Sequence, residues 1–139
     1  MKKAFSLLEL IFTISIIAII ATVAIPKFSN TLEKANIVKL KSDISAIREG
    51  LTRYKTNFIL KGEDNFEQEN LDKDELLFKK VIDYNIISSK SGGSWEKISN
   101  NSYNAYVNST DFVEFIYDKD NFTFDCNIKK NIYCEKLTQ

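Results

Sequence analysis

The chain begins with an apolar run and then changes to regularly spaced apolar positions among charged ones. The run covers Phe5–Ile25, 21 residues in which Glu9 is the single charge. As a helix it would be ~32 Å long at ~1.5 Å per residue, against ~30 Å of hydrocarbon in a bilayer. Lys2 and Lys3 precede it, so the positive-inside rule keeps the N-terminus cytoplasmic and sends the rest outward. The pattern therefore predicts one membrane-spanning helix.

Past Pro26, apolar residues recur at steps of three and four, which is the period of an amphipathic helix. This stripe consists of Ile37, Leu40, Ile44, Ile47, Leu51, Tyr54 and Phe58. We expect one helix from about Phe5 to Phe58, ~80 Å long and bent at Pro26, because proline offers no N–H to the Thr22 carbonyl. An isolated coiled coil is the alternative, but the stripe is short and the chain that follows can pack on it. The stripe is therefore predicted to pack against a β-sheet.

The C-terminal part carries short alternating segments typical of antiparallel strands. They are Tyr103–Val107, Phe112–Tyr117 and Phe122–Cys126, with a four-residue hairpin turn at Asp118–Asn121. A sheet of three or four strands is expected. Ser88–Ser94 is a loop by composition, and Trp95 is expected to cover the core rather than to anchor a ligand.

The connection Lys61–Lys80 is polar and contains seven acidic residues. This density suggests calcium, but the Asp-x-Asp-x-Asp-Gly spacing of a calcium loop is absent. A solvated acidic loop is therefore the default and calcium binding the alternative. A short helix is expected near Asp74–Val81.

The charge balance and the missing residue types exclude several classes of function. Lysine plus arginine and aspartate plus glutamate balance at 19 each, which argues against nucleic-acid binding through bulk positive charge. There is no histidine, the commonest general base and metal ligand, and no Gly-x-Ser-x-Gly motif. We therefore predict no enzyme, no catalytic residue, no metal and no cofactor.

Cys126 and Cys134 are the only cysteines. In a domain exported to an oxidising compartment, an even pair predicts a disulfide. Closing this loop would stabilise the fold by roughly 2.5 kcal/mol in the chain-entropy model. A metal pair is disfavoured without histidine, and a redox pair normally has Cys-x-x-Cys spacing.

An ordinary secretory signal peptide is one alternative for the N-terminus. The basic start fits it, and Thr22-Val23-Ala24 resembles its cleavage site. However, the uncharged run Leu10–Ile25 exceeds the usual ~7–15 residues, and neither Glu9 nor Pro26 suits such a signal.

Lys2-Lys3-Ala4, followed by Phe5-Ser6-Leu7-Leu8-Glu9 and the apolar run, resembles the class III signal of type IV prepilins and type II secretion pseudopilins. The resemblance covers about the first 30 residues. It implies that a prepilin peptidase cuts between Ala4 and Phe5 and methylates the new Phe5 amine. Glu9 is then fifth in the mature chain, where the family carries an acidic residue. Pro26 is twenty-second, where pilins often carry a helix-kinking proline. Ala4 stands where the family usually has glycine.

The resemblance implies a type IV pilin-like α+β fold, with a long N-terminal helix packed on a small antiparallel sheet. Its parts would be a leader (1–4), a transmembrane assembly helix (5–25), an amphipathic helix (26–58) and a periplasmic or extracellular α+β domain (59–139). The protein would cross the inner membrane once, with its C-terminal domain in the periplasm, before it joins a filament that can reach the cell surface.

The implied function is that of a pilin or minor pilin, a structural subunit of a type IV pilus or pilus-like filament. Its partners would be other pilins through their N-terminal helices, the prepilin peptidase and the inner-membrane assembly platform. Within the family, the alternative is a pseudopilin of type II secretion or of DNA uptake (competence). Outside it, the alternative is a secreted binding module. Many type IV pilins close a C-terminal segment with a disulfide and major type II pseudopilins usually have none, so Cys126 and Cys134 favour the pilus.

Glu9 has the predicted assembly role. A carboxylate in a membrane helix costs ~2.5–3.5 kcal/mol near the centre and indicates function by default, although Glu9 is one turn from the helix start and can reach the headgroups. The Glu9 of a neighbouring subunit can neutralise the cationic Phe5 amine and set the axial stagger between subunits. The alternative is an ion pair with the Phe5 amine of the same helix, which needs no assembly.

Overall fold

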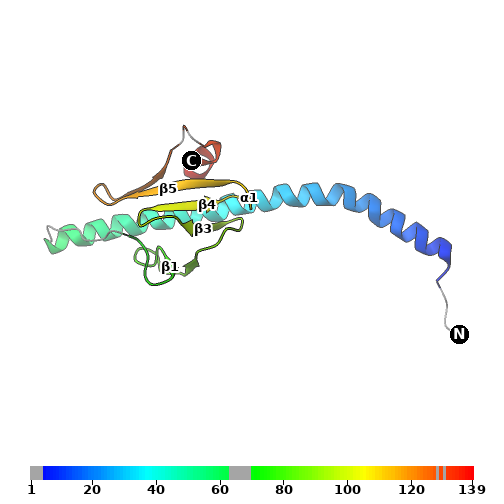
Figure 1. The fold of residues 1–139 in the computed structure, drawn as a ribbon, viewed down its shortest axis with the longest axis horizontal. Coiled ribbons are helices and arrows are strands. Elements are labelled where there is room, and N and C mark those ends of the chain that lie inside the picture. Colours follow the sequence, from blue (N-terminus) through cyan, green and yellow to red (C-terminus); the bar gives the residue numbers. More distant parts are fainter. Residues whose placement is uncertain (1–4, 63–69, 128, 130) are drawn as a thin grey trace. The chain divides into compact units, whose positions relative to one another are not determined.

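One helix, α1 (Leu7–Lys61), accounts for 55 residues and passes through Pro26 (Figure 1). The computed structural model describes residues 5–62, 70–127, 129 and 131–139. The chain divides into two units, the residues up to Lys34 and Ala35–Gln139, and α1 contributes to both. The long helix predicted from Phe5 to Phe58 is therefore present.

In the first unit, every large apolar side chain from Phe5 to Ile25 is exposed. By length and composition, α1 is the one helix in the described part of the chain that could cross a membrane. Three hydroxyl groups in the apolar run donate back to carbonyls of the same helix: Thr13 to Leu10 (2.8 Å), Ser15 to Ile11 (2.8 Å) and Thr22 to Ile19 (2.7 Å). These bonds satisfy the hydroxyl groups within the helix, so they need no partner chain.

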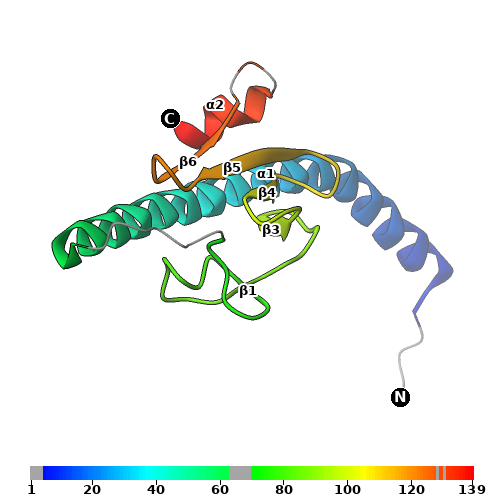
Figure 2. The ribbon, with the colours of Figure 1, turned by 60° about the vertical axis from the view of Figure 1, so that its left-hand side comes forward.

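Within its described residues, the second unit adds six strands and a short helix to α1. They are β1 (Leu76–Leu77), β2 (Ile86–Ile87), β3 (Ser94–Lys97), β4 (Ser102–Tyr106), β5 (Phe112–Asp118), β6 (Thr123–Cys126) and α2 (Ile132–Thr138). Strands β1 and β2 form a two-stranded sheet, and β3-β4-β5-β6 form an antiparallel sheet in chain order. Figure 2 shows α2 beside β5 and β6. The predicted α+β class and the three predicted strands are confirmed, and Trp95 lies in the fourth strand, β3.

The short helix predicted near Asp74–Val81 is wrong. β1 and turns occupy this segment, and Asp74 and Phe78 adopt left-handed backbone angles (φ 57° and 58°) that a right-handed helix excludes. The Asp72 carboxylate accepts a hydrogen bond from the Phe78 N–H (3.0 Å), and the Phe78 side chain is fully buried. Contacts with the core therefore override the local helical preference. The acidic residues at 63–69, and with them most of the candidate calcium loop, lie outside the described residues.

The core lies between one face of α1 and the four-stranded sheet. The middle of the predicted stripe, Leu40, Ile44, Ile47 and Leu51, is buried, and Ile37 packs against its edge. From the sheet come Trp95, Tyr103, Val113, Phe115, Tyr117 and Phe124, all 0–1% exposed. Along β5, buried and outward residues alternate, as expected for a sheet covered on one face. Two predictions are confirmed: the stripe packs against a sheet, and Trp95 covers the core.

Gly50 marks a close approach inside the second unit. A Cβ atom at this position would lie 2.1 Å from the carbonyl oxygen of Val81, so only glycine lets α1 pass the turn that follows Phe78.

We expect Gly50→Ala to destabilise the fold, although alanine favours a helix by about 1 kcal/mol over glycine. No rotamer change relieves an overlap with backbone, and forced shifts in a packed core cost about 1–3 kcal/mol. Urea unfolding of the full chain in detergent micelles, followed by the fluorescence of Trp95, the single tryptophan, measures the effect. Ser45→Ala, at an exposed α1 position, is the control and should be neutral or slightly stabilising. A midpoint for Gly50→Ala at or above that of the parent chain would contradict the prediction.

Asp43 is a buried carboxylate on α1. It forms hydrogen bonds with two aromatic side chains from other parts of the second unit. It accepts hydrogen bonds from the Trp95 indole (3.1 Å) and the Tyr84 hydroxyl (2.8 Å), and Lys39 lies 3.4 Å away. Because buried charge must be paired, these contacts fix the position of β3 on α1.

Asp72 is a second buried carboxylate, on the connection before β1. It accepts hydrogen bonds from the Tyr103 hydroxyl (3.1 Å) and the Phe78 N–H, and pairs with Lys97 at 2.8 Å. Burial, and then the Asp72 charge, raise the pKa of Tyr103 far above its usual value. The tyrosine therefore stays a hydrogen-bond donor, which the carboxylate requires.

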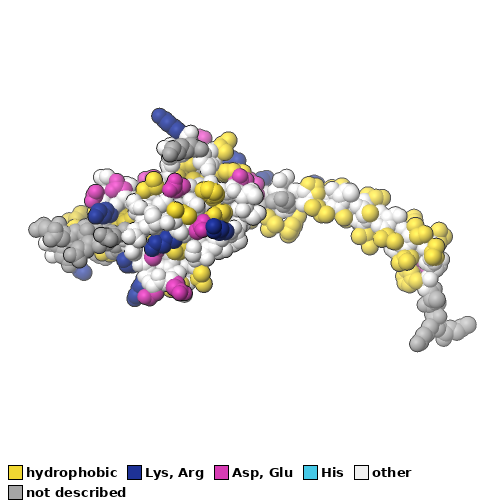
Figure 3. Space-filling model, viewed as in Figure 1, with side chains coloured by type: hydrophobic (Ala, Val, Ile, Leu, Met, Phe, Trp, Pro, Cys, Tyr) yellow, Lys and Arg dark blue, Asp and Glu magenta, His cyan; other side chains and the backbone are white. Residues whose placement is uncertain are grey.

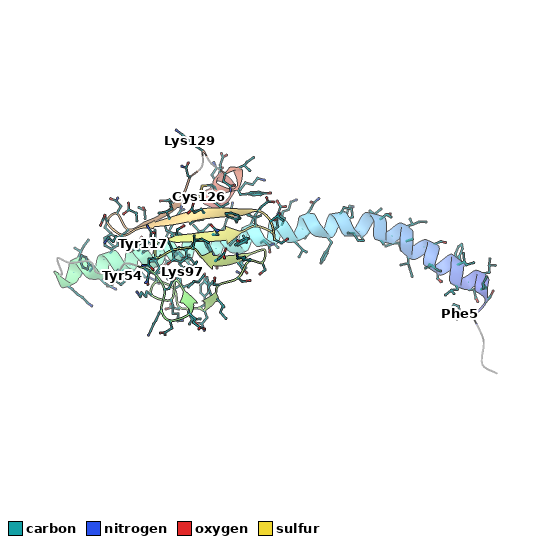
Figure 4. The ribbon with its side chains drawn as sticks, in the orientation of Figure 1. Phe5, Tyr54, Lys97, Tyr117, Cys126 and Lys129 are labelled. Atoms are coloured by element: carbon teal, nitrogen blue, oxygen red, sulfur yellow. A yellow bond between two sulfur atoms is a disulfide. The ribbon has the colours of Figure 1, made fainter. Side chains whose placement is uncertain are left out.

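Tyr117 is buried on the core side of β5, and its hydroxyl has no hydrogen-bond partner among the described residues. Burial, with smaller contributions from Tyr54, Asp118 and Asp120, raises the pKa of Tyr117 to about 12. Figure 4 marks Tyr54 on α1 and Tyr117 on β5.

The stability of the second unit is expected to fall above pH ~10. In the unfolded chain Tyr103 and Tyr117 ionise near pH ~10, whereas in the folded chain both keep their protons at higher pH. The unfolded state then binds fewer protons, and each tyrosine lowers the free energy of unfolding by up to about 1.4 kcal/mol per pH unit; below pH ~10 neither has an effect. Urea midpoints between neutral and alkaline pH measure this slope. Tyr117→Phe should be neutral or stabilising at pH 7 and should reduce the alkaline slope. An unchanged slope would contradict the assignment.

The predicted loop Ser88–Ser94 packs directly against α1. A Cβ atom at Gly92 would lie 2.4 Å from the Asn36 amide nitrogen, which donates to the Val107 carbonyl (2.9 Å). Lys39 donates to the carbonyl of Gly93, whose φ is +76°. The two glycines therefore allow the loop to lie directly against the helix.

Cys126 and Cys134 form a disulfide, as predicted, with Cα atoms 5.9 Å apart. It joins the edge strand β6 to α2, and Cys126 is labelled in Figure 4. Arg48 on α1 donates to the Phe124 carbonyl of the same strand (3.1 Å). These contacts cover part of an edge that is otherwise open to pairing with another chain.

Candidate functional site

Of the sequence-predicted residues, Glu9 lies in the first turn of α1 and Phe5 lies two residues before the helix begins. The Ser6 N–H donates to Glu9 Oε2 (3.0 Å), and the Leu8 N–H donates to Ser6 Oγ (3.3 Å). The Ser6 carbonyl accepts the first helical hydrogen bond, from Leu10 (3.1 Å). Ser6 is therefore the N-cap residue, and Ser6 and Glu9 form a capping box.

Sequence reasoning missed Ser6. The signal was present, because Ser-x-x-Glu immediately before an apolar run is the pattern of a capping box. The capping box also accounts for Glu9 without a partner chain. A carboxylate at a helix N-terminus is stabilised by the free N–H groups and the helix dipole. Glu9 therefore has a capping role that does not depend on the pairing with an amine expected from the sequence.

The surroundings of Glu9 are apolar. Phe5, Leu8 and Phe12 are 78%, 77% and 68% exposed, and with Glu9 and Thr13 they line a shallow hollow on one face of the helix. Figure 3 shows hydrophobic side chains along this part of α1, whereas the surface of Ala35–Gln139 carries charges of both signs. Glu9 therefore presents one anionic group on an apolar surface, and an electrostatic contact made there becomes stronger than in water once lipid or other helices exclude the water.

The other sequence-predicted residues are not gathered at this site. α1 continues through Pro26 as helix, and a kink there stays a prediction. Ala4, on the leader side of the predicted cut, lies outside the described residues. Cys126 and Cys134 belong to the second unit, where their disulfide joins β6 to α2.

The second unit has a hollow of about 460 Å³ where the β3–β4 and β5–β6 turns end. It is lined by Asn100, Asn101, Ile116, Tyr117, Asp118, Lys119 and Asp120. The Asp118 carboxylate already accepts hydrogen bonds from Asn121 and Asp120, which lower its pKa. Within the described residues, no three histidine, cysteine, aspartate or glutamate side chains are grouped as metal ligands. The hollow carries no functional assignment.

Together these observations define an α+β protein whose N-terminal helix is long and apolar enough to cross a membrane and carries one carboxylate in its first turn. Comparison with models of known families, with curated proteins and with solved structures finds no match for this chain.

Proposed function

We propose that this chain is a structural subunit, a pilin or minor pilin, of a type IV pilus or a pilus-like filament in the bacterial envelope. The observation that carries the proposal is the first turn of α1. A single carboxylate, Glu9, lies four residues after Phe5 in an otherwise uncharged run whose large side chains are all exposed. An apolar surface of this extent needs lipid or other helices around it.

The chemistry of assembly follows from that geometry. Cleavage before Phe5 creates a cationic amine at the membrane face, and the apolar helices pack side by side once subunits leave the lipid. An amine and a carboxylate that are each costly in a low dielectric stabilise one another when paired between neighbouring helices. The second unit has its own core, so it can lie outside the helix bundle.

The disulfide favours a pilus subunit over a major type II pseudopilin, because the latter usually lacks one. A pseudopilin of secretion or DNA uptake would share the N-terminal chemistry. Transformation, motility and secretion assays on a deletion strain distinguish these roles.

Processing provides the direct test. We expect the membrane-extracted protein to lack residues 1–4 and to carry one methyl group on the Phe5 amine. Loss of Lys2 and Lys3 leaves 17 basic and 19 acidic side chains, a shift in net charge from 0 to −2. Intact mass and isoelectric focusing measure both changes.

A strain without prepilin peptidase is the control and should retain the full chain. A mature protein that starts at Ile25 would contradict the proposal and indicate an ordinary signal peptide and a secreted binding module.

A further inference from the structure

The pair formed by Lys97 and Asp72 is the most buried lysine ion pair in the described part of the chain. Lys97 Nζ lies 2.8 Å from Asp72 Oδ2, and the two side chains are 33% and 6% exposed. By contrast, Lys39 lies 3.4 Å from Asp43 and is 57% exposed, and Lys90, in another pair, is 72% exposed. Figure 4 marks Lys97 on β3. A buried amine in contact with a buried carboxyl group holds the two halves of an amide bond together.

The two oxygens of Asp72 have different surroundings. Oδ1 accepts hydrogen bonds from the Phe78 N–H (3.0 Å) and the Tyr103 hydroxyl (3.1 Å), whereas Oδ2 contacts the Lys97 amine. The Tyr103 hydroxyl is also 3.1 Å from Oδ2, so it lies between both oxygens. Two donors directed at one carboxyl oxygen stabilise the negative charge that this oxygen acquires when a nucleophile attacks the carbon.

The geometry leaves a short path for that attack. Because a C–O bond is about 1.2 Å long, Lys97 Nζ already lies within about 4 Å of Asp72 Cγ, and a reactive approach is about 3–3.5 Å. The rings of Phe78 and Tyr103 are fully buried, with centroids 4.5 Å apart, so the residues that bind Asp72 also exclude water. Exclusion of water favours an amide over the separate groups, and fixed contact raises the effective concentration of the amine.

We propose that Lys97 and Asp72 form an amide bond within the chain, with Tyr103 as the catalytic residue. The inference does not depend on the proposed function. The bond joins the connection before β1 to β3 and closes a loop that contains β1, β2 and Ser88–Ser94. The disulfide joins β6 to α2 in another part of the same unit, but an amide, unlike a disulfide, withstands reduction.

The reaction needs no oxidant and no second reactant. The charged amine of Lys97 first passes one proton to Asp72 Oδ2, and the neutral nitrogen then attacks Cγ. The new C–N bond places negative charge on Oδ1, where the Phe78 N–H and the Tyr103 hydroxyl donate. A second proton passes from nitrogen to Oδ2 through the Tyr103 hydroxyl, the Cγ–Oδ2 bond breaks, and Oδ2 leaves as water. One positive and one negative group thereby become one neutral amide.

The first experiment measures the mass of the full, uncleaved chain after reduction and denaturation. We expect a mass one water molecule below that calculated from the sequence. Trypsin does not cut after an acylated lysine, so the digest should contain a branched peptide in which residues 62–73 are joined to residues 91–119. An unchanged mass would overturn the proposal. Loss of water without the branched peptide would also overturn it, because a cyclic imide at Asp72 loses water but leaves the peptides separate.

The second experiment compares three variants in the same digest. Lys97→Arg keeps the positive charge but offers no amine, so the branched peptide should be absent. Tyr103→Phe should slow bond formation by about 100-fold, the effect of removing one donor to a developing oxyanion, and freshly made chain should be mainly unlinked. Tyr106→Phe is the matched control on the same strand: its hydroxyl donates to Glu96, and linking should be complete.

A branched peptide that persists in Lys97→Arg, or rapid and complete linking in Tyr103→Phe, would overturn the proposed chemistry. The parent chain alone decides whether the bond exists, so the result does not depend on how well a variant folds. An ion pair that only stabilises the fold leaves the mass and the digest of every variant as its sequence requires.

Discussion

Replacing Glu9 by valine is expected to abolish or greatly reduce filament incorporation, while cleavage, membrane level and the fold of Ala35–Gln139 stay intact. Valine removes the only charge in Phe5–Ile25, so the Phe5 amine of a neighbouring subunit has no counter-charge when helices pack in a low dielectric. The apolar character that drives membrane insertion is unchanged or increased. The measurement is filament yield after shearing, with membrane level and N-terminal mass followed in the same strain.

Two matched variants separate the effect of side-chain length at position 9 from the effect of its charge. Glu9→Asp keeps the charge on a shorter side chain and should give an intermediate yield. Glu9→Gln keeps the length and the hydrogen-bond acceptor without the charge and should behave like Glu9→Val. Normal filament yield from Glu9→Val, in a strain with no parent copy, would end the proposed assembly role.

Phe78→Ala is expected to cost about 3–5 kcal/mol of folding free energy. The Phe78 ring is fully buried, with its centroid 4.5–5.5 Å from those of Tyr103, Trp95 and Phe124. Its removal leaves a cavity at the centre of the aromatic core, and the left-handed backbone strain at this position remains with alanine. Urea unfolding of the full chain in micelles, followed by Trp95 fluorescence, measures the loss.

Phe112→Ala is the matched control, because this phenylalanine is 44% exposed and its ring packs against that of Tyr106, with the centroids 5.4 Å apart. It should cost well under half as much. Phe78→Leu, which fills most of the cavity, should fall between the two. Equal midpoints for Phe78→Ala and Phe112→Ala would contradict the central position of Phe78.

Much of the fold was predictable because it depends on local periodicity. The alternating three- and four-residue steps of Leu40, Ile44 and Ile47 determine which face of α1 is buried, and alternation along β5 does the same for the sheet. The disulfide was predictable for a different reason: Cys126 and Cys134 are the only pair available.

The segment 70–87 was not predictable in the same way. Its composition favours a helix near Asp74–Val81, yet Phe78 takes a left-handed conformation because its ring is buried and its N–H is bound by Asp72. A sequence does not indicate that a given aspartate will be buried beside a distant tyrosine and lysine. The close approach at Gly50 is likewise invisible until Val81 is placed against it.

At the candidate site, the residue pattern pointed to Glu9, because a charge within an apolar run indicates function. The cut before Phe5 is what the resemblance to class III signals implies, and it stays a prediction. The capping bonds of Ser6 follow from spacing as well, since residues three apart on a helix are neighbours. The sequence therefore determined the long helix, its apolar and amphipathic parts, the strands and the cysteine pair, all of which rest on short-range order. Only the tertiary structure decided three other features. They are the path of 70–87, the partners that the buried Asp43 and Asp72 each bind, and the packing of the Gly92–Gly93 loop against α1. These depend on contacts between residues distant in the chain, whose burial energies exceed local preferences of about 1 kcal/mol.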